Sequence, residues 1–154
     1  MRIASPPTKS KAVATWAALL GGALGAHRFY LHGLRDPWGW LLWLPTLLGL
    51  WGLQRVNVLG QDDQLAWLLV PVLGFTLAGS MLQGIVLGLT PDADWQARHN
   101  PGAPTGPGAA KGWVTIIGVG LCLMLGATVL MATIAFSGQR YFEYQIEEAR
   151  KISQ

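Results

Sequence analysis

The amino-acid sequence predicts an all-α, polytopic membrane protein with four transmembrane helices, arranged as two hairpins and followed by a C-terminal helical extension. Hydrophobic residues make up 51% of the 154-residue chain and charged residues only 12%, which is about half the charged share of a typical soluble domain. The apolar residues are gathered into long runs, so too few polar residues remain for a water-facing surface. Both observations indicate a lipid environment.

Four apolar runs carry the expected spans. A hydrocarbon core of about 30 Å requires about 20 helical residues; the third and fourth runs meet this length and the first two come close to it. The runs cover residues 12–26, 38–53, 65–89 and 112–136. They divide the chain into a basic N-terminal tail (1–11), a first hairpin (12–59), a second hairpin (65–137) with a Pro/Gly-rich loop at 90–111, and a charged amphipathic C-terminal helix (138–154).

The first run has an alternative interpretation as a secretory signal. Basic residues Arg2, Lys9 and Lys11 precede it, and the small residues around Ala23 to Gly25 are typical of a cleavage site. Cleavage there would leave three spans. The residues that follow continue as a hairpin, so we expect the first run to be retained.

Small residues recur at a spacing of four within the runs. Lipid tails provide little hydrophobic drive between helices, so helices associate through close backbone approach, which small residues permit. These rows predict helix packing, either within the chain or against another subunit. The residues are Gly21 and Gly25; Ser80, Gly84 and Gly88; and Gly118, Cys122 and Gly126.

The long polar connection at 90–111 predicts one short surface helix. Thr90, Pro91 and Asp92 form a helix start, because proline fits the first helical turn and an acid is favourable there. The helix is expected to run through Trp95, and the Pro/Gly stretch at 100–108 reads as a flexible linker or lid.

Lysine and arginine residues in short loops set membrane orientation. With the N-terminus inside, the inner segments hold Arg2, Lys9, Lys11, Arg55, Arg140, Arg150 and Lys151, and the outer segments hold Arg28, Arg35, Arg98 and Lys111. The larger inner share predicts a multi-pass protein of the inner membrane with both termini in the cytoplasm.

Residues 27–37 predict a bend at the membrane surface between the first two runs. Gly33 supplies the flexibility of a tight return, and Asp36 followed by Pro37 is a typical helix start. The residues expected to contact lipid or a partner are Arg28, Phe29, Tyr30, Arg35 and Trp38. The aromatic rings among them are suited to headgroup depth.

Arg28 has three interpretations. It anchors the bend at the interface, it forms an ion pair, or it binds a ligand or lipid headgroup. Asp36 is its most reachable acidic partner, because the Asp62–Asp63 pair is expected on the opposite membrane face. His27 and His32 lack a neighbouring cysteine or carboxylate cluster, so no metal site and no cofactor are predicted.

The segment GAHRFYLHG resembles the TM-two domain family of small membrane proteins. Residues His27 to Leu31 match the typical His-Arg-Phe-Tyr-Leu-Gly stretch, while His32 replaces its glycine and Gly33 follows one place later. The family commonly has an acid after the second helix, where Arg55 stands here and Asp62–Asp63 come only later, which argues against a fixed arginine–acid pairing. The resemblance covers residues 9–58 and implies a helical hairpin core without a generally established activity.

No catalytic set recurs in or beside a run, and the polar residues within the runs are not ionisable. The sequence therefore predicts a non-enzymatic structural or interaction protein that packs with lipid, another membrane protein or itself. The alternative is a small transporter or channel subunit. Nucleic acid is not an expected partner, because no basic patch with interleaved aromatic residues lies outside the runs.

Overall fold

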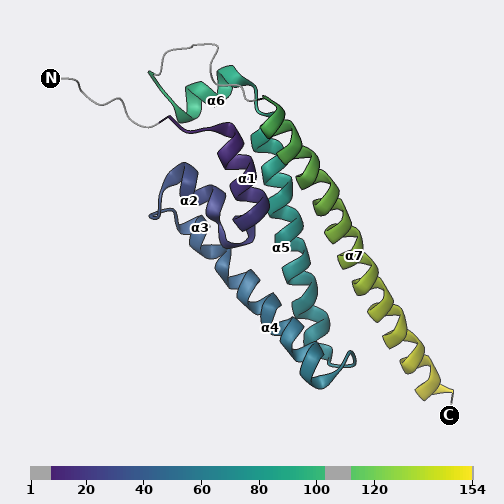
Figure 1. Ribbon diagram of the computed structural model, residues 1–154. Helices are drawn as coiled ribbons and strands as arrows, with labels where there is room; N and C mark the ends of the chain where they lie inside the picture. The colour runs from purple at the N-terminus through teal and green to yellow at the C-terminus, as the bar shows by residue number, and fades with distance from the viewer. Residues whose placement is uncertain (1–7, 103–111, 154) are drawn as a thin grey trace.

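The computed structural model describes residues 8–102 and 112–153, which form helices throughout and no β-strand within these ranges. The all-α prediction is confirmed. The elements are α1 (Lys11–Gly21), the 3₁₀ turn η1 (Gly22–Leu24), α2 (Ala26–His32), α3 (Pro37–Leu41), α4 (Trp43–Leu59), α5 (Gln64–Leu89), α6 (Asp92–His99) and α7 (Gly112–Ile152) (Figure 1). Two of them, α5 and α7, are long and apolar enough to cross a membrane.

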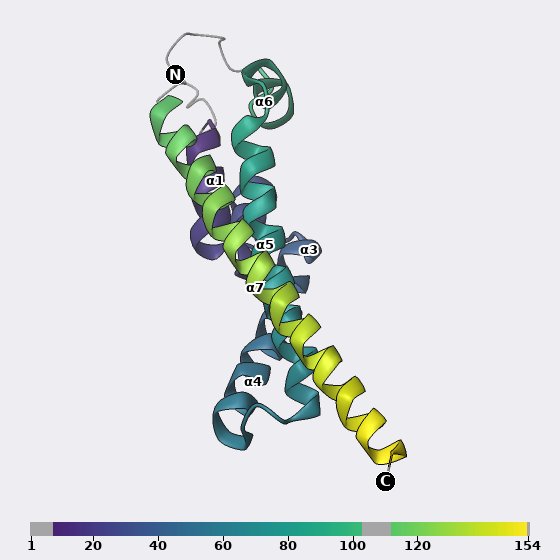
Figure 2. The same cartoon turned by 90° about the vertical axis from the view of Figure 1, so that its right-hand side faces the viewer.

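Helices α5 and α7 run antiparallel along one another and form the axis of the bundle (Figures 1 and 2). Glycines bring their backbones close: Gly74 faces Thr133, Gly84 faces Cys122, and Gly126 faces Met81. A β-carbon at any of these glycines would press on the opposite helix. The small-residue rows at Ser80, Gly84 and Gly88 and at Gly118 and Gly126 thus face other helices of the same chain.

Helices α1 and α4 pack along α5, one on each half, and α1 also contacts α7 (Figure 1). Gly22 of η1 lies against Ser80, and Gly88 lies against Thr15 of α1, so α1 follows the C-terminal half of α5. Gly49 and Gly52 of α4 lie against Leu73 and Leu69, so α4 follows the N-terminal half. The two elements are stacked end to end along α5.

The first apolar run is divided and is not one continuous helix. Helix α1 has 11 residues, and η1 ends at Leu24; the next residue, Gly25, has a positive φ of 76° and reverses the chain into α2. Gly25 therefore makes the turn and lies against the backbone of Gly39, which corrects its expected role in a helix row. Hydropathy could not show this break, because residues 22–25 of the turn lie inside the apolar run.

The other runs keep their expected extent more closely. The second run spans α3 and α4, which are separated at Leu42. Pro45 lies three residues later, and because it has no N–H to donate, it weakens the helical turn at this point. The fourth run and the C-terminal extension form one helix, α7. The expected surface helix is α6, and most of the Pro/Gly stretch, residues 103–111, lies outside the described residues.

Candidate functional site at the helix bends

The bend between α2 and α3 is closed by an ion pair. Arg28 Nε donates to Asp36 Oδ2 at 2.7 Å, and the Asp36 carboxylate also accepts from the backbone N–H of Trp38. The bond from Arg28 lowers the pKa of the Asp36 carboxyl. Of the three interpretations of Arg28, the ion pair with Asp36 is the one that the structure contains.

The other residues predicted for this bend divide into two groups. Phe29 packs on Gly39 and Trp40, and the hydroxyl of Tyr30 accepts from the backbone N–H of Ser10 at 2.7 Å. Both side chains therefore hold the bend together. In contrast, Arg35 and Trp38 are exposed, and Arg35 forms no ion pair with a carboxylate of the described residues. These two side chains are therefore accessible from outside the protein.

The bend between α4 and α5 repeats this arrangement. Arg55 binds Asp63 with two bonds, Nε to Oδ2 at 2.7 Å and Nη2 to Oδ1 at 2.8 Å. Asp63 also accepts from the N–H of Ala66 at the start of α5, and the bond from Arg55 lowers the pKa of its carboxyl. Arg28 and Arg55 thus each pair with the aspartate eight residues later in the chain.

Four residue types recur at identical spacing in the two bends, with each residue of the second following its counterpart by 27 positions. In both bends the glycine has a positive φ and its N–H closes the preceding helix, and the tryptophan indole donates to the carbonyl just after that glycine. This spacing in the sequence is the signal from which the second bend could have been predicted. The residues are Arg28, Gly33, Asp36 and Trp40, and Arg55, Gly60, Asp63 and Trp67.

Residues 7–55 match the model of the TM2 domain family. This segment is similar to a TM2 domain and is called the TM2 domain. The match confirms the resemblance at GAHRFYLHG and includes α1 to α3, most of α4 and Arg55. No match is found among the curated proteins or among the solved structures.

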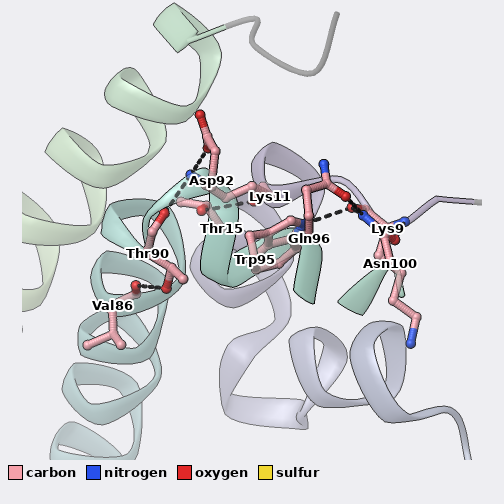
Figure 3. A network of polar contacts seen from close by, with 9 residues as sticks. All are labelled: Lys9, Lys11, Thr15, Val86, Thr90, Asp92, Trp95, Gln96 and Asn100. Atoms are coloured by element: carbon pink, nitrogen blue, oxygen red, sulfur yellow. Dashed lines mark hydrogen bonds and ion pairs between the residues drawn. The ribbon is translucent and has the colours of Figure 1, made fainter. Parts of the chain in front are cut away.

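A polar network ties the TM2 domain to α6, which lies outside it (Figure 3). The indole N–H of buried Trp95 donates to the carbonyl of Lys9 at 2.9 Å, and Asn100 accepts from the backbone N–H of Lys9 at 2.7 Å. Lys11 Nζ donates to Thr90 O at 2.6 Å and pairs with Asp92. Lys9 and Lys11 thus make specific contacts in addition to contributing charge, which the loop-charge count could not reveal.

His27 lies inside the bundle, where sequence reasoning considered only a metal role. Its side chain is 2% exposed, and its Nε2 is hydrogen-bonded to Gln83 Oε1 of α5. Within the described residues, no group of three or more histidine, cysteine, aspartate or glutamate side chains is placed to hold a metal ion. His27 therefore connects the TM2 domain to α5.

Arg140 of α7 covers the second bend. This arginine is 7% exposed and donates to Glu143 at 2.7 Å and to Gln61 of the α4–α5 connection at 3.0 Å. Its guanidinium carbon also lies 5.7 Å from the Trp67 ring centroid, within range of a cation–π contact. Sequence reasoning treated Arg140 only as a topological charge, because contact between α7 and this bend is long-range.

Two surface grooves accompany these contacts. An apolar groove of about 540 Å³ lies between α1 and the start of α7, and a mixed groove of about 490 Å³ lies beside Arg140, Trp67 and Tyr144. Neither groove is lined by Ser80 or Gln83. The two grooves thus lie away from the buried polar residues in the middle of α5.

Proposed function

We propose that this protein is a non-catalytic structural or accessory protein of the inner membrane that packs with lipid or with a partner membrane protein. The observation that carries this proposal is the distribution of its apolar side chains. Large ones are exposed on α5 and α7, with Leu68 at 68%, Leu82 at 61% and Met131 at 68%, while the glycine rows face inward. Large apolar side chains exposed along both long helices fit a lipid or protein environment.

The first bend is the best candidate for contact with lipid headgroups. Arg28 is paired with Asp36, whereas Arg35 and Trp38 of the same bend are both exposed. Arginine pairs well with phosphate oxygens, and tryptophan is favoured at headgroup depth. We therefore assign the contact to Arg35 and Trp38, with Arg28, Phe29 and Tyr30 as supporting residues.

The transporter alternative requires a polar cavity that reaches the middle of the bilayer, for which Ser80 and Gln83 are the available polar residues. Ser80 is 5% exposed and lies against Gly22, and Gln83 is engaged by His27. These contacts favour the structural role. The count of lysine and arginine predicts that both termini are cytoplasmic, but the helix contacts favour a different topology.

The proposal is tested on the full chain, purified from carbonate-washed membranes in lipid nanodiscs, with bound lipids and co-purified proteins identified by mass spectrometry. We expect anionic phospholipid to be enriched over the bulk membrane. Arg35→Ala should reduce this enrichment several-fold, because it removes the exposed guanidinium without disturbing the Arg28–Asp36 pair.

Arg98→Ala is the matched control, since Arg98 is also an exposed arginine but lies on α6. It should leave the enrichment unchanged. A wild-type protein with neither a lipid nor a protein enriched above the bulk membrane would overturn the proposal. Equal losses in both variants would assign lipid binding to general surface charge and not to the first bend.

A further inference from the structure

The two ends of the α1–α2 segment lie at the same end of the bundle. Lys11, at the start of α1, contacts Thr90 at the end of α5. Leu31, near the end of α2, accepts from Lys9 Nζ and clusters with Ala14 and Trp95. The chain thus runs along α5 in α1 and returns in α2 toward the end of the bundle at which it began.

The tip of this segment stops well short of the opposite end of α5. Gly22 meets Ser80, which lies about 15 Å along the helix from Thr90 and about 24 Å from Gln64 at a rise of about 1.5 Å per residue. Helix α4 occupies the remaining half of α5 through Gly49 and Gly52. The α1–α2 segment is therefore too short to cross a hydrocarbon core of about 30 Å.

The backbone at the tip is protected as burial in lipid requires. The Thr46 hydroxyl donates to Ala23 O at 2.6 Å, and the Trp43 indole donates to Leu24 O at 2.9 Å. The N–H of Gly25 donates to Gly22 O at 2.9 Å. An unsatisfied carbonyl in hydrocarbon costs several kcal/mol, so irregular backbone is tolerated at membrane depth only where protein groups satisfy it.

The two repeated bends mark the ends of the following segment. Residues 37–59 connect them and measure about 35 Å as helix, which matches the thickness of a membrane with its interfacial edges. Each bend places an arginine–aspartate pair and a tryptophan at its end of the segment. Charged pairs and tryptophans are both typical of the two membrane interfaces.

The first and last described residues lie at opposite ends of the bundle. Lys11 lies at the C-terminal end of α5, whereas Arg140 of α7 contacts Gln61 just before the N-terminal end of α5 (Figures 1 and 2). From Arg140 the helix continues in the same direction to Ile152. A membrane that α5 crosses would therefore place Thr8 and Ser153 on opposite faces.

We propose that α1, η1 and α2 form a re-entrant hairpin that enters and leaves the membrane on one face. The chain then crosses three times, through residues 37–59, α5 and α7, with residues 8 and 153 on opposite faces. This inference rests on the membrane location proposed above. It replaces the arrangement of four crossings with both termini in the cytoplasm. The described residues place nearly equal numbers of lysines and arginines on the two faces. The proposal therefore states which segments share a face, and not which face is cytoplasmic.

The first experiment uses the unsubstituted chain with an epitope tag at each end, in sealed membrane vesicles exposed to protease. We expect one tag to be lost and the other to be kept until detergent is added. Loss or protection of both tags together would overturn the inference, and so would a mixture of orientations.

The second experiment places single cysteines at exposed positions in a Cys122→Ala background and labels sealed vesicles with an impermeant maleimide. The positions are Thr8, Arg35, Asp62, Asp94 and Ser153. Thr8 decides the question: we expect it to label with Arg35 and Asp94, whereas four crossings would make it label with Asp62 and Ser153. Extraction of the protein by carbonate, with all five sites labelled at once, would instead reject the membrane location itself.

Discussion

The bends at α2–α3 and α4–α5 share one local structure but have different surroundings. In both, an arginine pairs with an aspartate that caps the next helix, and a tryptophan indole closes the turn. The second bend is covered by α7, because Arg140 reaches Gln61 and lies over Trp67. At the first bend, Arg35 and Trp38 remain exposed.

This difference shows that the same short motif serves two purposes. Covered by α7, it joins two helices and fastens a third to them. Uncovered, it presents a cation and an aromatic ring on a rigid turn, which is the arrangement proposed here for contact with lipid or a partner. The residues of each bend set its local geometry, whereas the helices packed around it decide whether its side chains are exposed for contact.

The largest expected effect concerns the glycines at the two bends. Gly33 and Gly60 have φ values of 83° and 89°, and a β-carbon at either would meet open space. Gly33→Ala and Gly60→Ala should therefore each destabilise the protein by about 2 kcal/mol through backbone strain alone. Unfolding in detergent micelles measures both. Clearly different losses of stability in the two variants would show that the two turns are not locally equivalent.

A smaller effect should separate the bends. Arg140→Ala removes hydrogen bonds from a buried guanidinium to Glu143 and Gln61, which corresponds to about 1.5 kcal/mol for bonds to charged groups. Arg35→Ala, at the uncovered bend, should change stability by less than about 0.5 kcal/mol. The same unfolding assay compares the two variants. Similar losses in both would remove the distinction between covered and uncovered bends.

The smallest effect lies where α6 covers the end of the TM2 domain. Burial against Trp95, together with the nearby charge of Lys9, lowers the pKa of His99 below 6.5. Docked α6 thus binds a proton less readily than undocked α6. Docking is therefore strongest above pH 6.5 and weakens as the pH falls below that value.

Hydrogen exchange of the α6 amides, corrected for intrinsic rates and measured at pH 7.5 and 5.5, tests this prediction. We expect a few-fold loss of protection at the lower pH. In His99→Gln, which cannot take up the proton, protection should not depend on pH. If the variant shows the same loss as the wild type, another group controls the docking of α6.

Several features could be predicted from the residues alone. The apolar runs predicted an all-α protein, and Asp36 followed by Pro37 predicted the start of α3, where the Asp36 carboxylate does accept from Trp38 N–H. GAHRFYLHG indicated the TM2 domain. Contacts between distant segments were out of reach, because nothing local specifies that Trp95 binds Lys9 or that Arg140 covers Trp67.

The chain by itself determined its helical class, its membrane-compatible composition and the two matching bends, because these depend on apolar content and on interactions within about ten residues. Only the tertiary structure decided how deep the first helix reaches. The turn at Gly25 lies inside the apolar run of residues 12–26, so hydropathy could not distinguish a continued helix from one that turns back. That choice depends on Thr46 and Trp43, which lie about 20 residues away in sequence and satisfy the turn's carbonyls only after α4 has packed against it.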